Sequence, residues 1–563
     1  MNKKLISLFL AAAMLLGMFA GCAKSTGEED VAAADTEESV RVSMTLTLTL
    51  PAKHTTDEAA EQVEAAINKL TQAKYDTAIK LNLIPEAEYQ AYIDEKLDST
   101  AAAILAEEEA AEARRKELKA LKAQGVDISA MESEESETVE SATEEETIIN
   151  DLGISIKQYP EVGEKQFDIF LVSGYDNYMR YIENEYIQQL DGELGGNSKL
   201  LKTYIYPTFL TLANVSGTYA IPNNHPVGEY QYLIVNKELV DKYDYDPNNL
   251  KTFLKCTDFI KDIGNQKLDG VVPLLGYVDA ANLVFWGSDP SEWSILSSQI
   301  TNTMTNSTKL APKSIFNNNV YVNTLSAMKE LEELGCIGDG TLEEGEKCAV
   351  GVVKGDASLA DKYSDEYYMY IYAKPMMTED DAYGHMLAVS SYSKSLSRSM
   401  EIVTYLNTDK AFRTILQYGV EGVHWEYEDE DSTDTIRILS DDYQMNLVDT
   451  GNVYMTYPDE GVSMDYWKYG KQQNLDSMAS PYIKFPGYIN EKNEEDLKAL
   501  DQLSKEFKAR VDALTYAEFS DAISAMKKEI KENEVFGRLI DNTSETSVVG
   551  VYTAWYEELY PAS

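Results

Sequence analysis

A strictly alternating stretch near the start of the chain constrains the fold more than any other feature. From Val42 to Leu50 apolar residues occupy every second position, which predicts a β-strand that Pro51 ends. Apolar residues at helical spacing follow from Val63 to Leu70, and a second strand is expected over 78–84. Because strand and helix alternate, we expect parallel strands in an α/β lobe.

This pattern is interrupted by a long charged segment. No aromatic residue lies between Tyr92 and Tyr159, and the 129–147 stretch holds eight Glu and no basic residue. Such a composition cannot bury enough apolar surface to order itself. We therefore interpret 101–163 as an insertion, which begins with one long exposed helix and continues as a disordered segment. The strand pattern resumes over 167–172.

The charge balance excludes several classes of function. Acidic residues outnumber basic ones by 96 to 49, so the formal net charge is −47. Such a field repels phosphate backbones and anionic lipids, and we expect no nucleic-acid partner. The four cysteines are too few for a disulfide scaffold, and the four histidines are not spaced for a metal site. We expect no metal and no cofactor.

The N-terminus is typical of an exported protein. An apolar run without charge, Leu5–Gly21, follows two lysines. The Ala-Gly pair that precedes Cys22 resembles the bacterial lipobox, whose cysteine is diacylated, for example with palmitate. The resemblance implies a signal peptide over 1–21, a flexible stalk over 22–40 and a lipid anchor on the outer face of the cell membrane. An ordinary cleaved signal, or an uncleaved anchor with a chance cysteine, is the alternative.

Motifs for catalysis are missing from the sequence. It has no dinucleotide-binding glycine motif, P-loop, His-Glu-x-x-His, Cys-x-x-Cys or Gly-x-Ser-x-Gly. The 391–394 stretch matches Ser-x-x-Lys, but a helix N-cap explains it better because it follows a strand and precedes a helix. Glycoside hydrolysis uses a pair of carboxylates, but in a chain with 96 acidic residues such a pair does not indicate this activity. Nothing in the residues argues for an enzyme.

Several stretches taken together resemble one family. In chain order they are 167–178, 219–222, 232–237, 387–394, 405–410 and 418–425. The chain resembles the extracellular solute-binding lipoproteins of ABC importers, in family 1, the carbohydrate-type group. The resemblance covers most of 40–563 apart from the insertion.

The resemblance implies a periplasmic-binding-protein-like α/β fold, with two α/β lobes, a hinge and a ligand cleft. The implied boundaries are 41–220 for the first part of lobe one, 221–375 for the first part of lobe two, 376–425 for the return to lobe one and 426–563 for a mostly helical C-terminal portion of lobe two. Hinge strands are expected at Tyr219–Pro222 and Ala373–Met376.

The physics of sugar recognition selects candidate ligand-binding residues within that frame. Apolar sugar faces pack on aromatic rings, and hydroxyl groups bond to charged or amide side chains. Tyr175, Asp176 and Tyr178 follow a buried strand, where α/β ligands bind. Asp176 as a helix cap is the alternative there. Glu229 and Tyr230 lie beside the implied crossover, which faces the cleft in relatives.

Further aromatic candidates lie in loop-like segments, although core packing is an open alternative for them. They are Trp286 within 282–293, His424 and Trp425 after a Tyr-Gly helix end, and Tyr466 and Trp467 within 463–468.

The resemblance implies a membrane-tethered protein that captures a small solute, an oligosaccharide above all, and delivers it to an ABC transporter permease. Two alternatives remain from the residues: a cell-surface hydrolase such as a glycosidase, and a binding protein for peptide or another polar solute.

Overall fold

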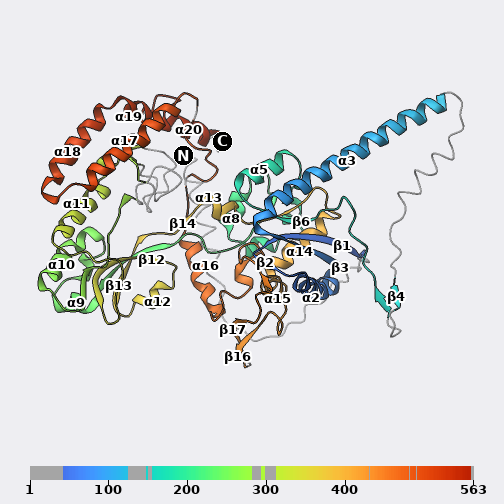
Figure 1. Cartoon of the computed structure of the whole chain (residues 1–563), viewed down its shortest axis with the longest axis horizontal. Helices are drawn as coiled ribbons and strands as arrows, with labels where there is room; N and C mark the ends of the chain where they lie inside the picture. Colours follow the sequence, from blue (N-terminus) through green and yellow to red (C-terminus); the bar gives the residue numbers. More distant parts are fainter. Residues whose placement is uncertain are drawn as a thin grey trace, which may run out of the picture. The chain divides into compact units, whose positions relative to one another are not determined.

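The computed structural model describes residues 42–123, 147–149, 155–281, 293–297, 312–429, 431–480, 482–489 and 491–559. Within these residues the chain forms two α/β lobes, each with its own larger sheet and hydrophobic core (Figure 1). We call the elements around the first sheet the first lobe. Those around the second sheet, together with the C-terminal helices, are the second lobe. The predicted α/β class with two lobes is confirmed.

The first sheet has five strands in the order β3-β1-β6-β15-β7. They span Met44–Ala52 (β1), Thr77–Pro85 (β3), Ile169–Val172 (β6), Ala220–Pro222 (β7) and Met386–Val389 (β15). β1 is parallel to β3 and to β6, which confirms the prediction of parallel strands, whereas β15 runs antiparallel to β6 and β7.

One prediction about β1 is wrong, because the strand continues through Pro51 to Ala52. The pairing of β1 with β6 reaches only Thr49, while its pairing with β3 includes Pro51 opposite Ile84. Pro51 therefore lies where β1 has lost one neighbour, and a missing N–H is tolerated on such an edge.

Helix α2 (Asp57–Tyr75) shows why the sequence folds locally as predicted. The Thr56 hydroxyl accepts a hydrogen bond from the Ala59 N–H at 3.2 Å and caps the helix. Val63 and Ile67 are fully buried in the core of the first lobe. Helices α14 (Leu396–Thr408) and α15 (Lys410–Tyr418) contribute to the same core.

A buried carboxylate ties the centre of the first sheet to the turn after β15. Asp168 is 0% exposed and accepts hydrogen bonds from the Thr47 N–H at 2.8 Å, the Ser393 hydroxyl at 2.8 Å and the Lys394 N–H at 2.7 Å. Ser395 then caps α14 through the Arg398 N–H. The Ser-x-x-Lys stretch is thus part of a structural turn before a capped helix.

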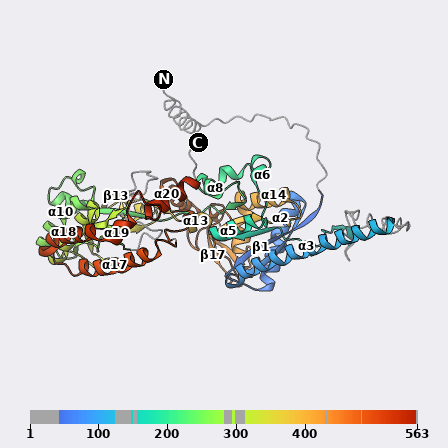
Figure 2. The same ribbon diagram turned by 90° about the horizontal axis from the view of Figure 1, so that it is seen from above.

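One continuous helix, α3 (Glu86–Ala123), begins before the predicted insertion, runs through its start at 101 and extends well past the first sheet (Figures 1 and 2). A short antiparallel pair, β4 (Thr147–Ile149) and β5 (Ser155–Lys157), follows. Lys157 pairs with Asp76 at 2.8 Å, which ties the end of the insertion to the first lobe. Nearly all of the stretch predicted to be disordered, 129–147, lies outside the described residues.

The second sheet has four strands in the order β13-β8-β12-β9. They span Tyr230–Asn236 (β8), Val271–Leu274 (β9), Lys347–Gly355 (β12) and Tyr367–Ala373 (β13). β12 is parallel to β9, and β8 is antiparallel to both of its neighbours. Around it are helices α9 (Lys237–Lys242), α10 (Phe253–Gln266) and α11 (Asn319–Glu333).

Four C-terminal helices form a second core within this lobe. They are α17 (Glu494–Asp512), α18 (Tyr516–Glu532), α19 (Glu534–Leu539) and α20 (Val548–Leu559). α11 belongs to both cores, because Tyr321 and Leu325 face the C-terminal helices whereas Met328 and Leu331 face the second sheet. The C-terminal helices are thereby attached to the second lobe.

The lobe boundaries stay a prediction. One stretch within 426–563, the range expected to belong to lobe two, packs in the first lobe instead. β18 (Tyr443–Gln444) pairs with β2 (His54–Thr55), and Tyr443 and Met445 are buried in the core of the first lobe.

The remaining elements are short. They are α5 (Tyr175–Glu183), α6 (Asp191–Gly195), α7 (Leu201–Tyr204), α8 (Pro207–Ala213), α12 (Leu359–Tyr363), α13 (Glu379–Tyr383), α16 (Trp467–Asp476), β10 (Leu296–Ser297), β11 (Lys313–Ser314), β14 (Met376–Met377), β16 (Trp425–Asp429), β17 (Ser432–Ile438) and β19 (Met478–Ala479).

Candidate ligand site at the chain crossings

The chain passes between the two lobes three times. The crossings are 223–229, after β7; 374–378, after β13; and 474–480, at the end of α16. The second and third crossings pair as parallel strands β14 and β19, with the Met478 N–H bonded to the Pro375 carbonyl at 2.9 Å. The second crossing overlaps the predicted hinge strand Ala373–Met376. The other predicted hinge strand, Tyr219–Pro222, instead contains β7 of the first sheet and leads into the first crossing. The sequence did not reveal the third crossing.

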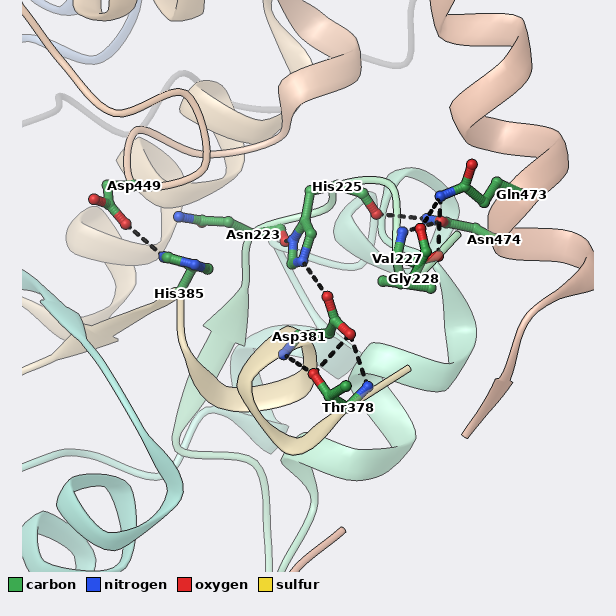
Figure 3. Close-up of polar contacts among 10 residues, drawn as sticks. All are labelled: Asn223, His225, Val227, Gly228, Thr378, Asp381, His385, Asp449, Gln473 and Asn474. Carbon is green, nitrogen blue, oxygen red and sulfur yellow. Dashed lines mark hydrogen bonds and ion pairs between the residues drawn. The ribbon is translucent and has the colours of Figure 1, made fainter. Parts of the chain in front are cut away.

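The first crossing is bonded to the third by the Asn474 side chain (Figure 3) and closely approaches the backbone of the second at Gly228. The Asn474 side chain accepts from the Val227 N–H at 3.0 Å and donates to the His225 carbonyl at 2.7 Å. Gly228 has a φ of +58°, and a Cβ on it would lie 2.6 Å from the backbone of Met376. Only glycine fits this close approach without displacing the second crossing.

Two histidine–carboxylate pairs flank the first crossing (Figure 3). His225 lies 3.7 Å from Asp381, and His385 lies 2.6 Å from Asp449. Desolvation acts to raise the pKa of Asp381, but the contacts with His225 and with Thr378 outweigh it and lower the pKa. A charged Asp381 is therefore favoured between the crossing and the start of α13.

A group of five polar side chains gathers where the second sheet meets the crossings. We call it the tyrosine–aspartate cluster: Tyr230, Tyr232, Asp356, Tyr466 and Asp476. The Tyr230 ring stacks on Tyr232 with centroids 4.9 Å apart, and its hydroxyl donates to Asp476 at 2.5 Å. The Tyr466 hydroxyl donates to Asp356. Three tyrosine rings and two carboxylates from several elements thus lie together.

Tyr232 is the member of the cluster with unused binding capacity. It is half-buried, and its hydroxyl has no hydrogen-bond partner within the part of the chain that the structure describes. Desolvation, followed by the charges of Asp476 and Asp356, raises its pKa, so the hydroxyl keeps its proton and can donate it. Beside the cluster, Glu229 and Lys354 form a half-exposed ion pair at 2.8 Å.

A second polar group lies at the carboxyl end of β6; we call it the Asp176 patch. Its members are Tyr175, Asp176, Glu379, Tyr383 and Lys484. Asp176 is exposed, and the Tyr175 and Tyr383 rings have centroids 4.9 Å apart. Desolvation raises the pKa of Glu379 and the charge of Asp176 raises it further, although the Lys484 N–H bonds to Glu379 at 2.6 Å. The patch therefore joins the end of β6 to the start of α13.

Lys484 has an unusual backbone conformation within this patch. Its φ is +68°, and it is 7% exposed. Its carbonyl accepts from the Trp555 indole at 3.0 Å, so it joins the patch to α20. Burial lowers the pKa of the Lys484 ammonium. A strained residue of this kind persists only where its surroundings hold it in place, and such residues concentrate at ligand sites.

The other predicted site residues have structural roles in the described part of the chain. Tyr178 is fully buried and bonds to the Ala213 carbonyl and the Tyr219 N–H. The Trp425 indole bonds to the Gly419 carbonyl at 3.0 Å, and His424 accepts from the Val420 N–H at 3.0 Å. Contact of these side chains with a ligand stays a prediction.

Trp467 and Trp286 complete the predicted set. Trp467 is buried and begins α16, with its indole bonded to the Thr456 carbonyl at 2.7 Å. The expectation of a loop at Tyr466–Trp467 is wrong, because a 3₁₀ turn leads directly into that helix. Trp286 lies outside the described residues.

Sequence reasoning missed six residues of these two groups: Tyr232, Asp356, Asp476, Glu379, Tyr383 and Lys484. Asp356 follows the carboxyl end of β12, as Asp176 follows that of β6, so the same rule applied to the second lobe identifies it. The others depend on how the third crossing packs, which no local pattern reveals.

Other site types find no support in the described residues. No group of three or more His, Cys, Asp or Glu side chains there could hold a metal ion. Cys256, Cys336 and Cys348 are free and buried. Among the helices that the structure describes, none combines the length and apolarity needed to span a membrane.

Comparison with known proteins finds one partial relative and several similar structures. No family model matches the chain. Over 158 residues it is 26% identical to a carbohydrate ABC transporter substrate-binding protein of Streptococcus pneumoniae, a stretch that covers 27% of this chain and 31% of the relative. The match thus spans less than a third of that relative's length. The predicted resemblance to carbohydrate-type solute-binding proteins is confirmed in this relative.

Two solved structures are also similar. The N-glycan transport solute binding protein NgtS of Streptococcus pneumoniae is 16% identical, with a TM-score of 0.49 and coverage of 92% of this chain and 99% of that chain. An extracellular solute-binding protein of family 1 from Alicyclobacillus acidocaldarius is 12% identical, with a TM-score of 0.38 and coverage of 87% and 99%.

Proposed function

We propose that this protein is a membrane-tethered extracellular solute-binding protein that captures an oligosaccharide between its lobes and delivers it to an ABC transporter permease. The tyrosine–aspartate cluster carries the proposal. It offers stacked rings, a Tyr232 hydroxyl that has no hydrogen-bond partner among the described residues, and two carboxylates, Asp356 and Asp476, near the crossings. Rings pack on apolar sugar faces, and carboxylates accept strong hydrogen bonds from sugar hydroxyls.

Ligand binding at the crossings would couple capture of the solute to a change in the arrangement of the two lobes. Tyr230 and Tyr232 belong to the second sheet, while Asp476 lies in the third crossing. A ligand that contacts Tyr232, Asp476 and the Asp176 patch together favours the arrangement in which these groups are near one another. Such a differential affinity shifts a hinge equilibrium without any chemical step, and the permease then recognises the shifted state.

Capture without turnover distinguishes this function from that of a cell-surface hydrolase. The relative with the matching stretch is a transport protein by description. We propose that this chain likewise binds carbohydrate and leaves it unchanged. Product formation from a mixed glycan panel would contradict the proposal, and tight binding of peptides with no glycan binding would favour a peptide carrier.

The test uses the full-length chain and titration calorimetry against glycans that stabilise it in a thermal-shift screen. Replacing Tyr232 with Ala should lower affinity by about 1–3 kcal/mol, or roughly ten- to a hundred-fold. Tyr245→Ala is the matched control, since Tyr245 is another half-buried tyrosine of the second lobe and its hydroxyl bonds to Asp262. If Tyr232→Ala and Tyr245→Ala bind glycans with equal affinity, the tyrosine–aspartate cluster is not part of the binding site.

We propose in addition that Cys22 carries the lipid anchor. Two acyl chains give stable attachment where one chain does not. In cells, Cys22→Ser should release the protein into the medium or leave its precursor uncleaved. Normal processing together with unchanged partitioning into the detergent phase would rule out this anchor while leaving the binding function intact.

A further inference from the structure

The second lobe contains a polar cavity of about 250 Å³ that lies apart from the chain crossings. It opens after the carboxyl end of β9 and is bounded by α11 and α17. Cavities for drug-sized ligands are usually larger, at about 300–1,000 Å³. This cavity therefore fits one small ring.

The cavity has an aromatic wall. The Trp293 indole donates to the Tyr321 hydroxyl at 2.9 Å, which fixes both rings. Tyr321 is only 4% exposed, whereas Tyr277 at the mouth is 57% exposed. Within the described residues, neither the Tyr321 nor the Tyr277 hydroxyl has an acceptor for its own proton. Fixed rings with free hydroxyl protons suit a ligand that has both an apolar face and oxygen acceptors.

Charged side chains of both signs surround the aromatic wall. Lys508 pairs with Asp512 at 2.6 Å, and Lys329 bonds to the Asp512 carbonyl at 2.9 Å. Asp279 accepts only the Ala281 N–H, at 2.8 Å, among the described residues. Asp279 lines the cavity, and its carboxylate keeps acceptor capacity. Because the lysines are already paired, the rim favours a neutral polyhydroxylated ligand over an anion.

We propose that this cavity is a subsite for one pyranose ring of the same glycan whose other end occupies the tyrosine–aspartate cluster. This inference rests on the proposed function. β9 and β12 are parallel neighbours, with Leu274 opposite Val350, so the cavity and Asp356 both follow the carboxyl ends of adjacent strands. Asp356 lies six positions after Val350, which is roughly 20 Å along a strand, and the lining of the cavity begins three positions after Leu274, at Tyr277. A ligand that occupies both sites is a glycan of several rings.

The experiment measures affinity against glycan length. Full-length protein is titrated with a series from the monosaccharide to the hexasaccharide of each sugar that stabilises it. Asp279→Asn and Tyr321→Phe keep side-chain volume while removing the charge or the hydroxyl. Each should weaken the longer glycans about tenfold and leave the shortest ligands unchanged. Asp521→Asn and Tyr516→Phe, at exposed positions on α18, are the matched controls.

The outcomes separate the two proposals. If Asp279→Asn binds glycans of every length as tightly as wild type, the cavity is not a subsite. The same holds if the variant loses the same factor of affinity for glycans of every length. If Tyr232→Ala then still weakens binding, the proposed function stands. Failure of the wild-type protein to bind any glycan overturns both.

Discussion

Two aromatic regions of the molecule look alike in sequence and differ in what their polar atoms bind. In the tyrosine–aspartate cluster, tyrosine hydroxyls bond to carboxylates, and the Tyr232 hydroxyl is unpaired in the described structure. In the second region, which we call the hairpin cluster, Trp425, Tyr427 and Tyr457 pack at the β16–β17 pair. There the Trp425 indole and the Tyr457 hydroxyl bond to backbone carbonyls.

The partner of the polar atom thus indicates the role of the ring. A backbone carbonyl is a fixed acceptor that the fold must satisfy, so a ring bonded to it belongs to the core. A half-buried carboxylate with remaining lone pairs can also accept from a ligand. We expect the hairpin cluster to contribute stability and the tyrosine–aspartate cluster to contribute affinity.

The largest expected effect concerns the hairpin cluster. Trp425→Ala removes a ring that is 3% exposed and should lower the free energy of unfolding by about 3–5 kcal/mol, measured by urea denaturation. Glycan affinity, measured well below the melting point, should stay within error of wild type. A tenfold loss of affinity at unchanged stability would instead place Trp425 in the ligand site and break the comparison.

Asp176→Ala sharpens the comparison at the other polar group. Helix α5 has Gly174 at its N-cap and no side-chain hydrogen bond there, so Asp176 does not cap it. Loss of a charge-assisted bond to a sugar hydroxyl should cost about 1.5–3 kcal/mol of binding free energy by calorimetry. The melting temperature of the ligand-free protein should hardly change. A lower melting point with full affinity would assign Asp176 a structural role.

A matched pair of hydroxyl deletions tests the same contrast with smaller effects. Tyr466→Phe removes the bond to Asp356, and Tyr457→Phe removes the 2.9 Å bond to the Thr433 carbonyl. The first should weaken glycan binding by about 1 kcal/mol with little change in unfolding. The second should lower unfolding free energy by about 1 kcal/mol and leave binding intact. Identical profiles for the two variants would contradict the distinction.

The smallest effect is a pH dependence of the hairpin region. Burial lowers the pKa of His424, which accepts the Val420 N–H in its neutral form. Its stabilising contribution is therefore complete above the unfolded-state pKa near 6.5 and is lost as pH falls below it. His424→Asn should flatten the acid limb of stability against pH, whereas His54→Asn, at an exposed position, should not. An unchanged slope in both would exclude this titration.

The sequence predicted the elements more completely than the site. The alternation from Val42 to Leu50 and the cap at Thr56 identify β1 and α2, since both patterns are local. Asp176, Glu229 and Tyr230 could be predicted from the sequence, because Asp176 follows the end of a strand and the other two lie at the end of the first crossing. Asp476 and Lys484 were not, because α16 and the third crossing pack beside residues about 250 and 105 positions away.

The length of helix α3 amplifies any rotation of the first lobe. Its 38 residues correspond to about 57 Å, and its outer half is mostly exposed. A rotation of the first lobe by about 10° displaces the far end by about 10 Å, an amplification set by length alone. A dye on Ala120→Cys would report that rotation optically, because Cys256, Cys336 and Cys348 are buried and compete poorly for the label.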